Sequence, residues 1–254
     1  MSPLCFELHE IEKFSSNFYL PKGTKLLGSV LLLHGSEGGG FGYHDFDAQI
    51  LASHGFATLA FTWCGSPRAP VKGLPSVVID IELERTIEAM RWLRNDPRLV
   101  VTKQAICGVS RGAEQAIILA ALSTQTDEIP KPDAVAVLAP SDVYVSGFSW
   151  NWQSVGGPEP DDPDAYAWKL HGRNCGEVGK AIPIESFNGQ VLLCHGEEDE
   201  IWSVNRSRNL EERLRSANRK VQTHYMVGEK HALSSAGLHS YRATLVEFLE
   251  RALA

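Results

Sequence analysis

Apolar and polar residues follow two different patterns along this chain. Short runs that are apolar over most of their length are typical of strands buried on both faces of a parallel sheet. We interpret six such runs as strands: 30–33, 56–63, 104–109, 133–139, 191–195 and 221–227. Residues 5–20 mix apolar and charged positions in two segments, which predicts an antiparallel hairpin at the edge of the sheet.

Stretches with helical spacing separate the predicted strands. In residues 77–95, apolar side chains recur at steps of three and four, and Asp96-Pro97 marks the end of the helix. Further helices are predicted at 45–54, 113–122, 204–214 and 238–249. Strands that alternate with helices indicate an α/β fold with a doubly wound, mostly parallel sheet.

The alternation stops between residues 141 and 186. Four aromatic residues stand there among glycine, proline and aspartate without sustained periodicity: Trp150, Trp152, Tyr166 and Trp168. Because long loops in compact domains are usually functional, we interpret this segment as a cap-like insertion after the strand that ends near residue 139. The expected organisation is a single domain over residues 1–254 that carries the insertion 141–186.

Composition narrows the classes of partner. The 254 residues carry a formal net charge of −7 and contain no block of basic residues, which argues against nucleic acid or an anionic membrane as a partner. The five cysteines are scattered without a C-x-x-C pair, so we expect reduced thiols and no metal or other cofactor. No leader-like or membrane-spanning apolar run is present, which favours a soluble, cytoplasmic protein. Assembly into a homo-oligomer is left open.

The segment Gly108-Val109-Ser110-Arg111-Gly112 carries the strongest chemical signal. It lies between a predicted strand and a predicted helix, the context of a nucleophile elbow, in which a sharp turn exposes a serine hydroxyl. Glycine-flanked serines also occur in ordinary turns, so this interpretation depends on finding an acid and a base elsewhere in the chain.

An acid and a base follow two later predicted strands. The loop 196–202 contains four carboxylates, of which we select Asp199 as the acid that orients the base. Three neighbouring carboxylates are interpreted as solvated loop charges, and Asp142 is the reserve acid; the three are Glu197, Glu198 and Glu200. His231 follows the strand 221–227 and is the predicted general base. Two other histidines, His224 and His239, are interpreted as packed or solvated side chains.

The order Ser110, Asp199, His231 is the chain order of the catalytic triad in the α/β-hydrolase fold. Acyl chemistry also needs an oxyanion hole. We expect one donor to be the backbone N–H of Arg111 and the other to be that of Ser36 or Glu37, although the glycines around them are also typical of a flexible turn.

Two further features remain open at the level of the sequence. The Arg111 side chain is suited either to a salt bridge or to an anionic substrate. Four tryptophans are candidates for lining an apolar acyl pocket, and packing of a cap onto the sheet is the alternative: Trp63, Trp150, Trp152 and Trp202.

With these motifs in place, the chain resembles the α/β-hydrolase superfamily over roughly residues 26–250. It is most similar to the catalytic domain of the acyl-CoA thioesterase and bile acid-CoA:amino acid N-acyltransferase family, and next to the dienelactone hydrolases. The residues that carry this resemblance are 54–60, 108–114, 182–184 and 196–202. In the first family, lysine usually stands where Arg111 does and a β-sandwich domain precedes the catalytic one, whereas this chain begins close to the catalytic domain.

The resemblance and the motifs together predict a serine hydrolase that cleaves a small-molecule ester or thioester through an acyl-Ser110 intermediate. Since the family uses either serine or cysteine, Ser110 favours hydrolysis over acyl transfer. The alternatives are a dienelactone hydrolase-like esterase or lactonase, an acyltransferase with an amine or alcohol acceptor, and a ligand-binding protein that keeps only the fold.

Overall fold

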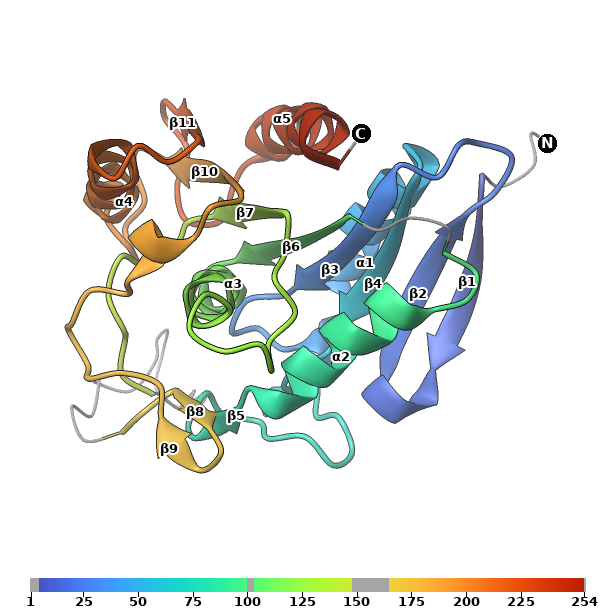
Figure 1. Cartoon of the computed structure of the whole chain (residues 1–254), viewed down its shortest axis with the longest axis horizontal. Helices are drawn as coiled ribbons and strands as arrows, with labels where there is room; N and C mark the ends of the chain where they lie inside the picture. The colour runs from blue at the N-terminus through green and yellow to red at the C-terminus, as the bar shows by residue number, and fades with distance from the viewer. Residues whose placement is uncertain (1–4, 100–102, 148–164, 254) are drawn as a thin grey trace.

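One large sheet runs through the middle of the molecule (Figure 1). The computed structural model describes residues 5–99, 103–147 and 165–253, and within them the strand order is β1-β2-β4-β3-β6-β7-β10-β11. The strands are β1 (Phe6–Ile11), β2 (Ser16–Pro21), β3 (Gly28–Leu33), β4 (Phe56–Phe61), β6 (Gln104–Val109), β7 (Ala134–Leu138), β10 (Gln190–Gly196) and β11 (Val221–Met226).

The pairing of these strands confirms the predicted fold class. The hairpin β1-β2 is antiparallel and joins β4 in antiparallel fashion, whereas every pair from β4 to β11 is parallel. The chain order reverses direction at β3, which lies between β4 and β6. Ligands of doubly wound sheets bind at such a switch point, beyond the carboxyl ends of the strands.

Helices cover both faces of the sheet because successive strand residues point to opposite sides. In β3, Leu31 and Leu33 pack on the face covered by α2 (Glu84–Asn95), α3 (Arg111–Leu122) and α4 (Asn205–Ser216). Val30 and Leu32 pack on the opposite face, under α1 (Tyr43–Ser53) and α5 (Ser235–Leu253). Burial on both faces explains why this strand is a continuous apolar run.

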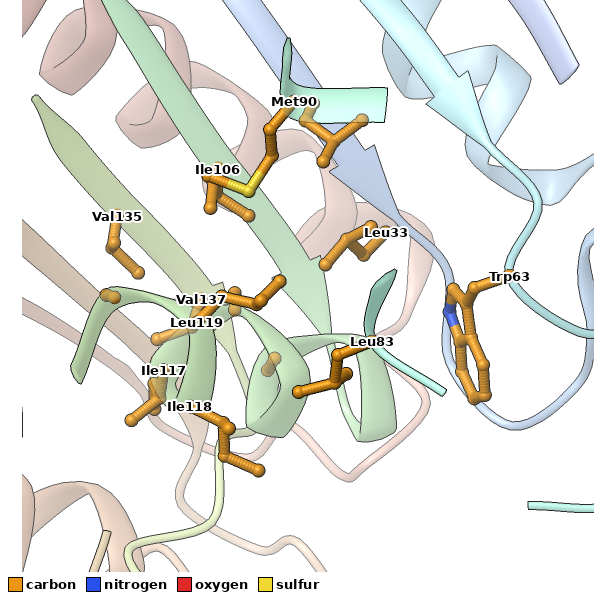
Figure 2. Close-up of a cluster of buried hydrophobic side chains, with 14 of the residues drawn as sticks. Leu33, Trp63, Leu83, Met90, Ile106, Ile117, Ile118, Leu119, Val135 and Val137 are labelled. Carbon is orange, nitrogen blue, oxygen red and sulfur yellow. The ribbon is translucent and has the colours of Figure 1, made fainter. Parts of the chain in front are cut away.

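The core between α2, α3 and the sheet is built from large aliphatic side chains. Figure 2 shows Met90 of α2 beside Ile106 of β6, and Ile117 of α3 near Val135 and Val137 of β7. This packing fixes the start of α3 relative to the ends of β6 and β7. In the described part of the chain, no helix combines the length and hydropathy needed to cross a membrane.

The helix predicted over 77–95 is shorter than expected, because α2 begins only at Glu84. Before it, Asp80 has a positive φ of 54°, and β5 (Ile81–Glu82) pairs with β8 (Trp168–Leu170). Backbone hydrogen bonds to residues 166, 167 and 169 take the place of helical ones. The helical spacing in the sequence continued through this segment, but a partner more than 80 residues away determines its conformation.

The described parts of the region 141–186 lie over the ends of α2 and α3. The strand β8 also pairs with β9 (Arg173–Asn174), and isolated bridges join Val143 to Ala181 and Ser146 to Tyr166. Three 3₁₀ turns complete the described elements: η1 (Glu12–Phe14), η2 (Gly39–Phe41) and η3 (Ile184–Ser186).

Candidate active site

Ser110 lies at the sharp turn between β6 and α3. Its backbone angles are φ 52° and ψ −117°, a conformation that costs energy for any residue with a β-carbon. A β-carbon at Gly108 would come within 2.3 Å of the carbonyl oxygen of Gly112, and one at Gly112 equally close to that of His34. Both glycines are therefore required by close backbone contacts, one of them with the loop that follows β3.

Ser110, His231 and Asp199 are brought together from three loops. Oγ of Ser110 lies 3.0 Å from Nε2 of His231, and Nδ1 of His231 lies 2.7 Å from Oδ2 of Asp199. The Asp199 side chain is fully buried, whereas that of His231 is 19% exposed. These distances allow Nδ1–H to donate to the carboxylate while Nε2 accepts from the serine hydroxyl.

The environment of Asp199 keeps its carboxyl group ionised. Burial alone raises the pKa of Asp199, but hydrogen bonds from His195 and His231 and the charge of His231 lower it by more, so the net pKa lies well below the usual range. The other carboxylate oxygen accepts from the backbone N–H groups of Ile201 and Trp202, each at 2.8 Å. An acid held in this way can orient His231 and stabilise its protonated form.

A second histidine, His195, also contacts Asp199. Its Nε2 lies 3.0 Å from Oδ2 of Asp199 and 2.8 Å from the carbonyl oxygen of Trp202. Both of these atoms are acceptors, so Nε2 carries the proton, and Nδ1 is 2.7 Å from the hydroxyl of Ser207 in α4. This contact was not predicted from the sequence, although a histidine that ends a buried apolar strand was a usable signal.

The loop after β3 approaches the serine, as the predicted oxyanion site requires. A β-carbon at Gly35 would lie 3.4 Å from Cβ of Ser110. The side chain of Glu37 turns back and accepts the Gly35 N–H at 3.0 Å, and burial raises the pKa of this carboxyl group. Arg111 is the first residue of α3, where backbone N–H groups point out of the helix. The loop after β3 and the start of α3 both lie close to Ser110, and the donor roles of Ser36, Glu37 and Arg111 remain predictions.

Trp63 packs against His34, at the start of the loop that follows β3. It is 2% exposed, and its ring stacks on His34 with the centroids 4.8 Å apart. Its indole N–H donates to the carbonyl oxygen of His34 at 2.9 Å, and its backbone N–H donates to Nε2 of the same residue at 3.2 Å. Trp63 thus supports the loop after β3, which carries the predicted oxyanion donors. It does not line the cavity beside His231 that is described below.

The other tryptophans have different positions. Trp202 is 8% exposed and its ring centroid lies 6.1 Å from that of His231, with the guanidinium groups of Arg111 and Arg206 at 5.5 and 5.6 Å. Trp150 and Trp152 lie outside the described residues.

The Arg111 side chain forms a buried ion pair. Its Nη1 lies 2.8 Å from the Glu114 carboxylate, and its Nη2 donates to the carbonyl oxygen of Ser146 at 2.5 Å. Glu114 in turn accepts the backbone N–H of Val145 at 2.8 Å. Both side chains are almost fully buried, with 4% and 0% exposed. This pair joins the elbow helix to the start of the region 141–186.

The competing acids and bases have other partners. Asp142 accepts from Asn209 and lies near Arg206, and His224 lies 2.9 Å from the hydroxyl of Ser240. His239 lies in the middle of the last helix, α5. The neighbouring loop carboxylates have other positions: Glu197 pairs with Arg208, Glu200 accepts the His231 backbone N–H, and Glu198 lies on the same turn. Among the described residues, no cluster of histidine, cysteine, aspartate or glutamate is suited to a metal ion.

A cavity of about 340 Å³ adjoins His231 on the α1 and α5 side of the sheet. Its apolar walls include Leu32, Val109 and Leu138, from the ends of β3, β6 and β7. Eight of its lining residues are polar or charged: His34, Glu37, Tyr43, His44, Asp47, His231, Tyr241 and Arg242. The volume lies at the small end of the range of about 300–1,000 Å³ for ligand pockets.

Comparison with known proteins identifies relatives of two kinds and solved structures with a similar fold. The rat acyl-coenzyme A amino acid N-acyltransferase 2 is 26% identical over 219 residues, covering 79% of this chain and 47% of that protein. The mouse acyl-coenzyme A thioesterase 6 is 30% identical over 193 residues, covering 74% and 43%. The dienelactone hydrolase of Anabaena variabilis has a similar structure, with a TM-score of 0.61, 16% identity and coverage of 98% and 100%.

These relatives confirm the predicted resemblance, and the structural neighbour confirms the fold. The chain spans about half the length of the curated relatives that it matches. Residues 80–254 match the prolyl oligopeptidase family, a region that contains Ser110, Asp199 and His231. Because this match covers more than half of the chain, the protein belongs to the prolyl oligopeptidase family, within the α/β-hydrolase superfamily.

Proposed function

We propose that this protein is a serine hydrolase that cleaves a carboxylic ester or thioester through an acyl-Ser110 intermediate. The observation that carries the proposal is the hydrogen-bonded chain from Ser110 through His231 to Asp199, with Ser110 in a strained turn at the switch point of the sheet. A serine hydroxyl is a weak nucleophile at neutral pH, and this arrangement supplies the base that activates it.

In this mechanism, His231 removes the proton from Ser110 Oγ as that oxygen attacks the substrate carbonyl carbon. The negative charge that develops on the carbonyl oxygen is stabilised by the backbone N–H of Arg111 and that of Ser36 or Glu37. Protonated His231, stabilised by Asp199, then gives its proton to the leaving alcohol or thiol. Water attacks the acyl-enzyme by the same route, releasing the acid and restoring the Ser110 hydroxyl.

Labelling with a fluorophosphonate probe tests the nucleophile. We expect the wild type and Ser53→Ala to be labelled and Ser110→Ala to remain unlabelled. Ser53 is a suitable control because it lies at the exposed end of α1. Equal labelling of Ser110→Ala would contradict the assignment of the nucleophile.

A turnover panel then tests the substrate class. Short and long p-nitrophenyl esters, lactones and acyl-CoA thioesters are compared on the wild type and Ser110→Ala. In another serine hydrolase, removal of the nucleophile lowers kcat by about 10⁶-fold, so we expect the Ser110→Ala rate to approach background. Ligand binding without turnover of any member of the panel would favour a non-catalytic role.

Acyl transfer is the second candidate, because curated relatives include amino acid N-acyltransferases as well as a thioesterase. Product analysis with added glycine, taurine or a primary alcohol separates it from hydrolysis. We expect free acid as the product, since this chain has serine as its nucleophile. Formation of the amide or the new ester in preference to the acid would support transfer.

A further inference from the structure

The loop after β3 is attached at both ends to the chain that follows β4. At its start, the indole N–H of Trp63 donates to the carbonyl oxygen of His34 at 2.9 Å. At its end, the Gly39 N–H donates to the carbonyl oxygen of Cys64, also at 2.9 Å. Residues 35–37 lie between these attachments, and their first residue is the part of the loop that approaches the nucleophile. The conformation of this middle part therefore determines which backbone N–H groups can meet an oxyanion.

The side chain of Glu37 folds back over this middle part of the loop. Its Oε1 accepts the Gly35 N–H at 3.0 Å. The backbone N–H groups of Glu37 itself and of Gly35 both lower the pKa of the carboxyl group, although burial raises it by more. Both N–H groups therefore face the carboxyl group, which ties the two ends of the segment 35–37 together.

Ser36 lies between these two residues and differs from them. The Gly38 N–H donates to the carbonyl oxygen of Gly35 at 3.5 Å, so Ser36 and Glu37 form the centre of a turn. The N–H groups of the central residues are not part of the hydrogen bond that closes such a turn. In the part of the chain that the structure describes, the Ser36 N–H has no hydrogen-bond partner, and the residue is partly exposed. Of the two predicted loop donors, Ser36 is thus the one whose N–H can bind a substrate oxygen.

We propose that Glu37 is a positioning residue, whose carboxyl group holds the loop in the conformation in which the Ser36 N–H, and not its own, is the second oxyanion donor beside Arg111. The inference rests on the proposed function, since an oxyanion forms only when Ser110 attacks a carbonyl group. The carboxyl group acts through the loop: it accepts two N–H groups and thereby fixes the direction of the third.

Loss of this carboxyl group should affect the transition state more than the bound substrate. Donors that are already in place stabilise the charge that develops on the carbonyl oxygen without any rearrangement of the loop. Without the carboxyl group, the Gly35 and Glu37 N–H groups lose their acceptor, and the loop can adopt other conformations. The substrate in its ground state carries little charge on that oxygen. The expected result is a lower kcat with little change in KM.

Two substitutions of Glu37 test this expectation with a p-nitrophenyl ester that the wild type cleaves. Glu37→Leu removes the acceptor, and we expect kcat to fall at least about tenfold with KM nearly unchanged. Glu37→Gln keeps a carbonyl oxygen that can accept the Gly35 N–H, so it should retain most of the activity. A third variant, Ser36→Pro, removes the proposed donor and should lower kcat by about 10²–10³-fold.

Glu198→Leu is the matched control. It removes an exposed carboxylate from the loop that carries Asp199, and kcat should stay within about twofold of the wild type. A purely structural role of Glu37 would lower the melting temperature of Glu37→Leu and leave the kcat of the folded enzyme unchanged, which would overturn the proposal. Equal losses in Glu37→Gln and Glu37→Leu would also overturn it, because the charge would then matter and not the acceptor.

Nuclear magnetic resonance of the wild type identifies the donor directly, with 1,1,1-trifluorooctan-2-one as the probe. Oγ of Ser110 adds to the ketone carbon, the serine proton passes to His231, and the ketone oxygen becomes the oxyanion of a hemiketal. We expect the amide proton of Ser36 to shift downfield in this adduct by more than that of Glu37, which faces its own carboxyl group in the free protein. A larger shift at Glu37 than at Ser36 would contradict the proposal.

The same probe separates failure of this inference from failure of the proposed function. An adduct that forms without a downfield shift at Ser36 refutes only the assignment of the donor and of the positioning residue. If the wild type neither forms the adduct nor cleaves any ester, the hydrolase proposal fails, and the inference about Glu37 fails with it.

Discussion

The two sides of Ser110 use buried polar residues in opposite ways. On the side of α1 and α5, the Tyr241 hydroxyl is buried in the apolar core without a hydrogen-bond partner among the described residues. On the other side, Arg111 and Glu114 are just as buried but pair with each other and with the backbone of residues 145 and 146. Paired groups hold two parts of the chain together, whereas an unpaired hydroxyl in the apolar core makes no such connection.

Removal of Arg111 should have the largest effect on stability. Arg111→Met leaves the Glu114 carboxylate buried without its cation, and breaking a buried pair in this way costs about 3–5 kcal/mol. The free energy of unfolding in urea measures the loss, and the double variant Arg111→Met/Glu114→Gln should recover part of it. A loss below about 1 kcal/mol for the single variant would mean that the pair does not stabilise the fold.

His195→Phe should reduce activity while leaving the nucleophile in place. The substitution removes the N–H that Asp199 accepts, and a hydrogen bond to a charged group contributes about 1.5–3 kcal/mol. We therefore expect kcat to fall about tenfold or more, with fluorophosphonate labelling of Ser110 slower but retained. In addition, the pKa of Asp199 should rise, which nuclear magnetic resonance titration of its carboxyl carbon can measure. A variant with wild-type kcat would rule out a positioning role for His195.

The ionised state of Asp199 should make stability depend on pH in a defined direction. Its pKa is lowered in the folded protein, so its contribution to stability is complete above the unfolded pKa of about 3.9 and is lost as the pH falls toward the folded value. The stability advantage of the wild type over Asp199→Asn should therefore be constant from about pH 5 to 7 and shrink below about pH 4. Thermal unfolding of both proteins across this range measures it, and an advantage that grows toward acid pH would contradict the assignment.

Tyr241→Phe should have the smallest effect on stability. It removes a hydroxyl group that has no hydrogen-bond partner in the described part of the chain, so the free energy of unfolding should stay within about 0.5 kcal/mol of the wild type or rise. Tyr19→Phe is the matched comparison, because the Tyr19 hydroxyl donates to Asp45 at 2.7 Å and its loss should be destabilising. If Tyr241→Phe is destabilised as much as Tyr19→Phe, the Tyr241 hydroxyl is not an unpaired group.

Local patterns in the sequence were enough to predict the fold class and the three residues that meet at the elbow. Apolar periodicity reports which residues of a strand or helix are buried, and glycines at 108 and 112 report a backbone turn that few other residues permit. The loops that carry Ser110, Asp199 and His231 each follow a parallel strand, and such strands end at the same edge of the sheet. Their proximity therefore follows from topology, without knowledge of any particular contact.

Contacts between distant parts of the chain were decided only by the tertiary structure. The start of α2 depends on pairing of β5 with β8, and the partners of Arg111 include the backbone of residue 146, 35 residues later. The sequence likewise left open the position of Trp63, which packs on His34. It placed His195 at the end of a buried strand but did not show that His195 shares Asp199 with His231. Sequence periodicity indicates which side chains are buried, but it does not identify the residues that they contact. That choice is made by packing, which paired Arg111 with Glu114 and, within the described residues, left the Tyr241 hydroxyl without a hydrogen-bond partner.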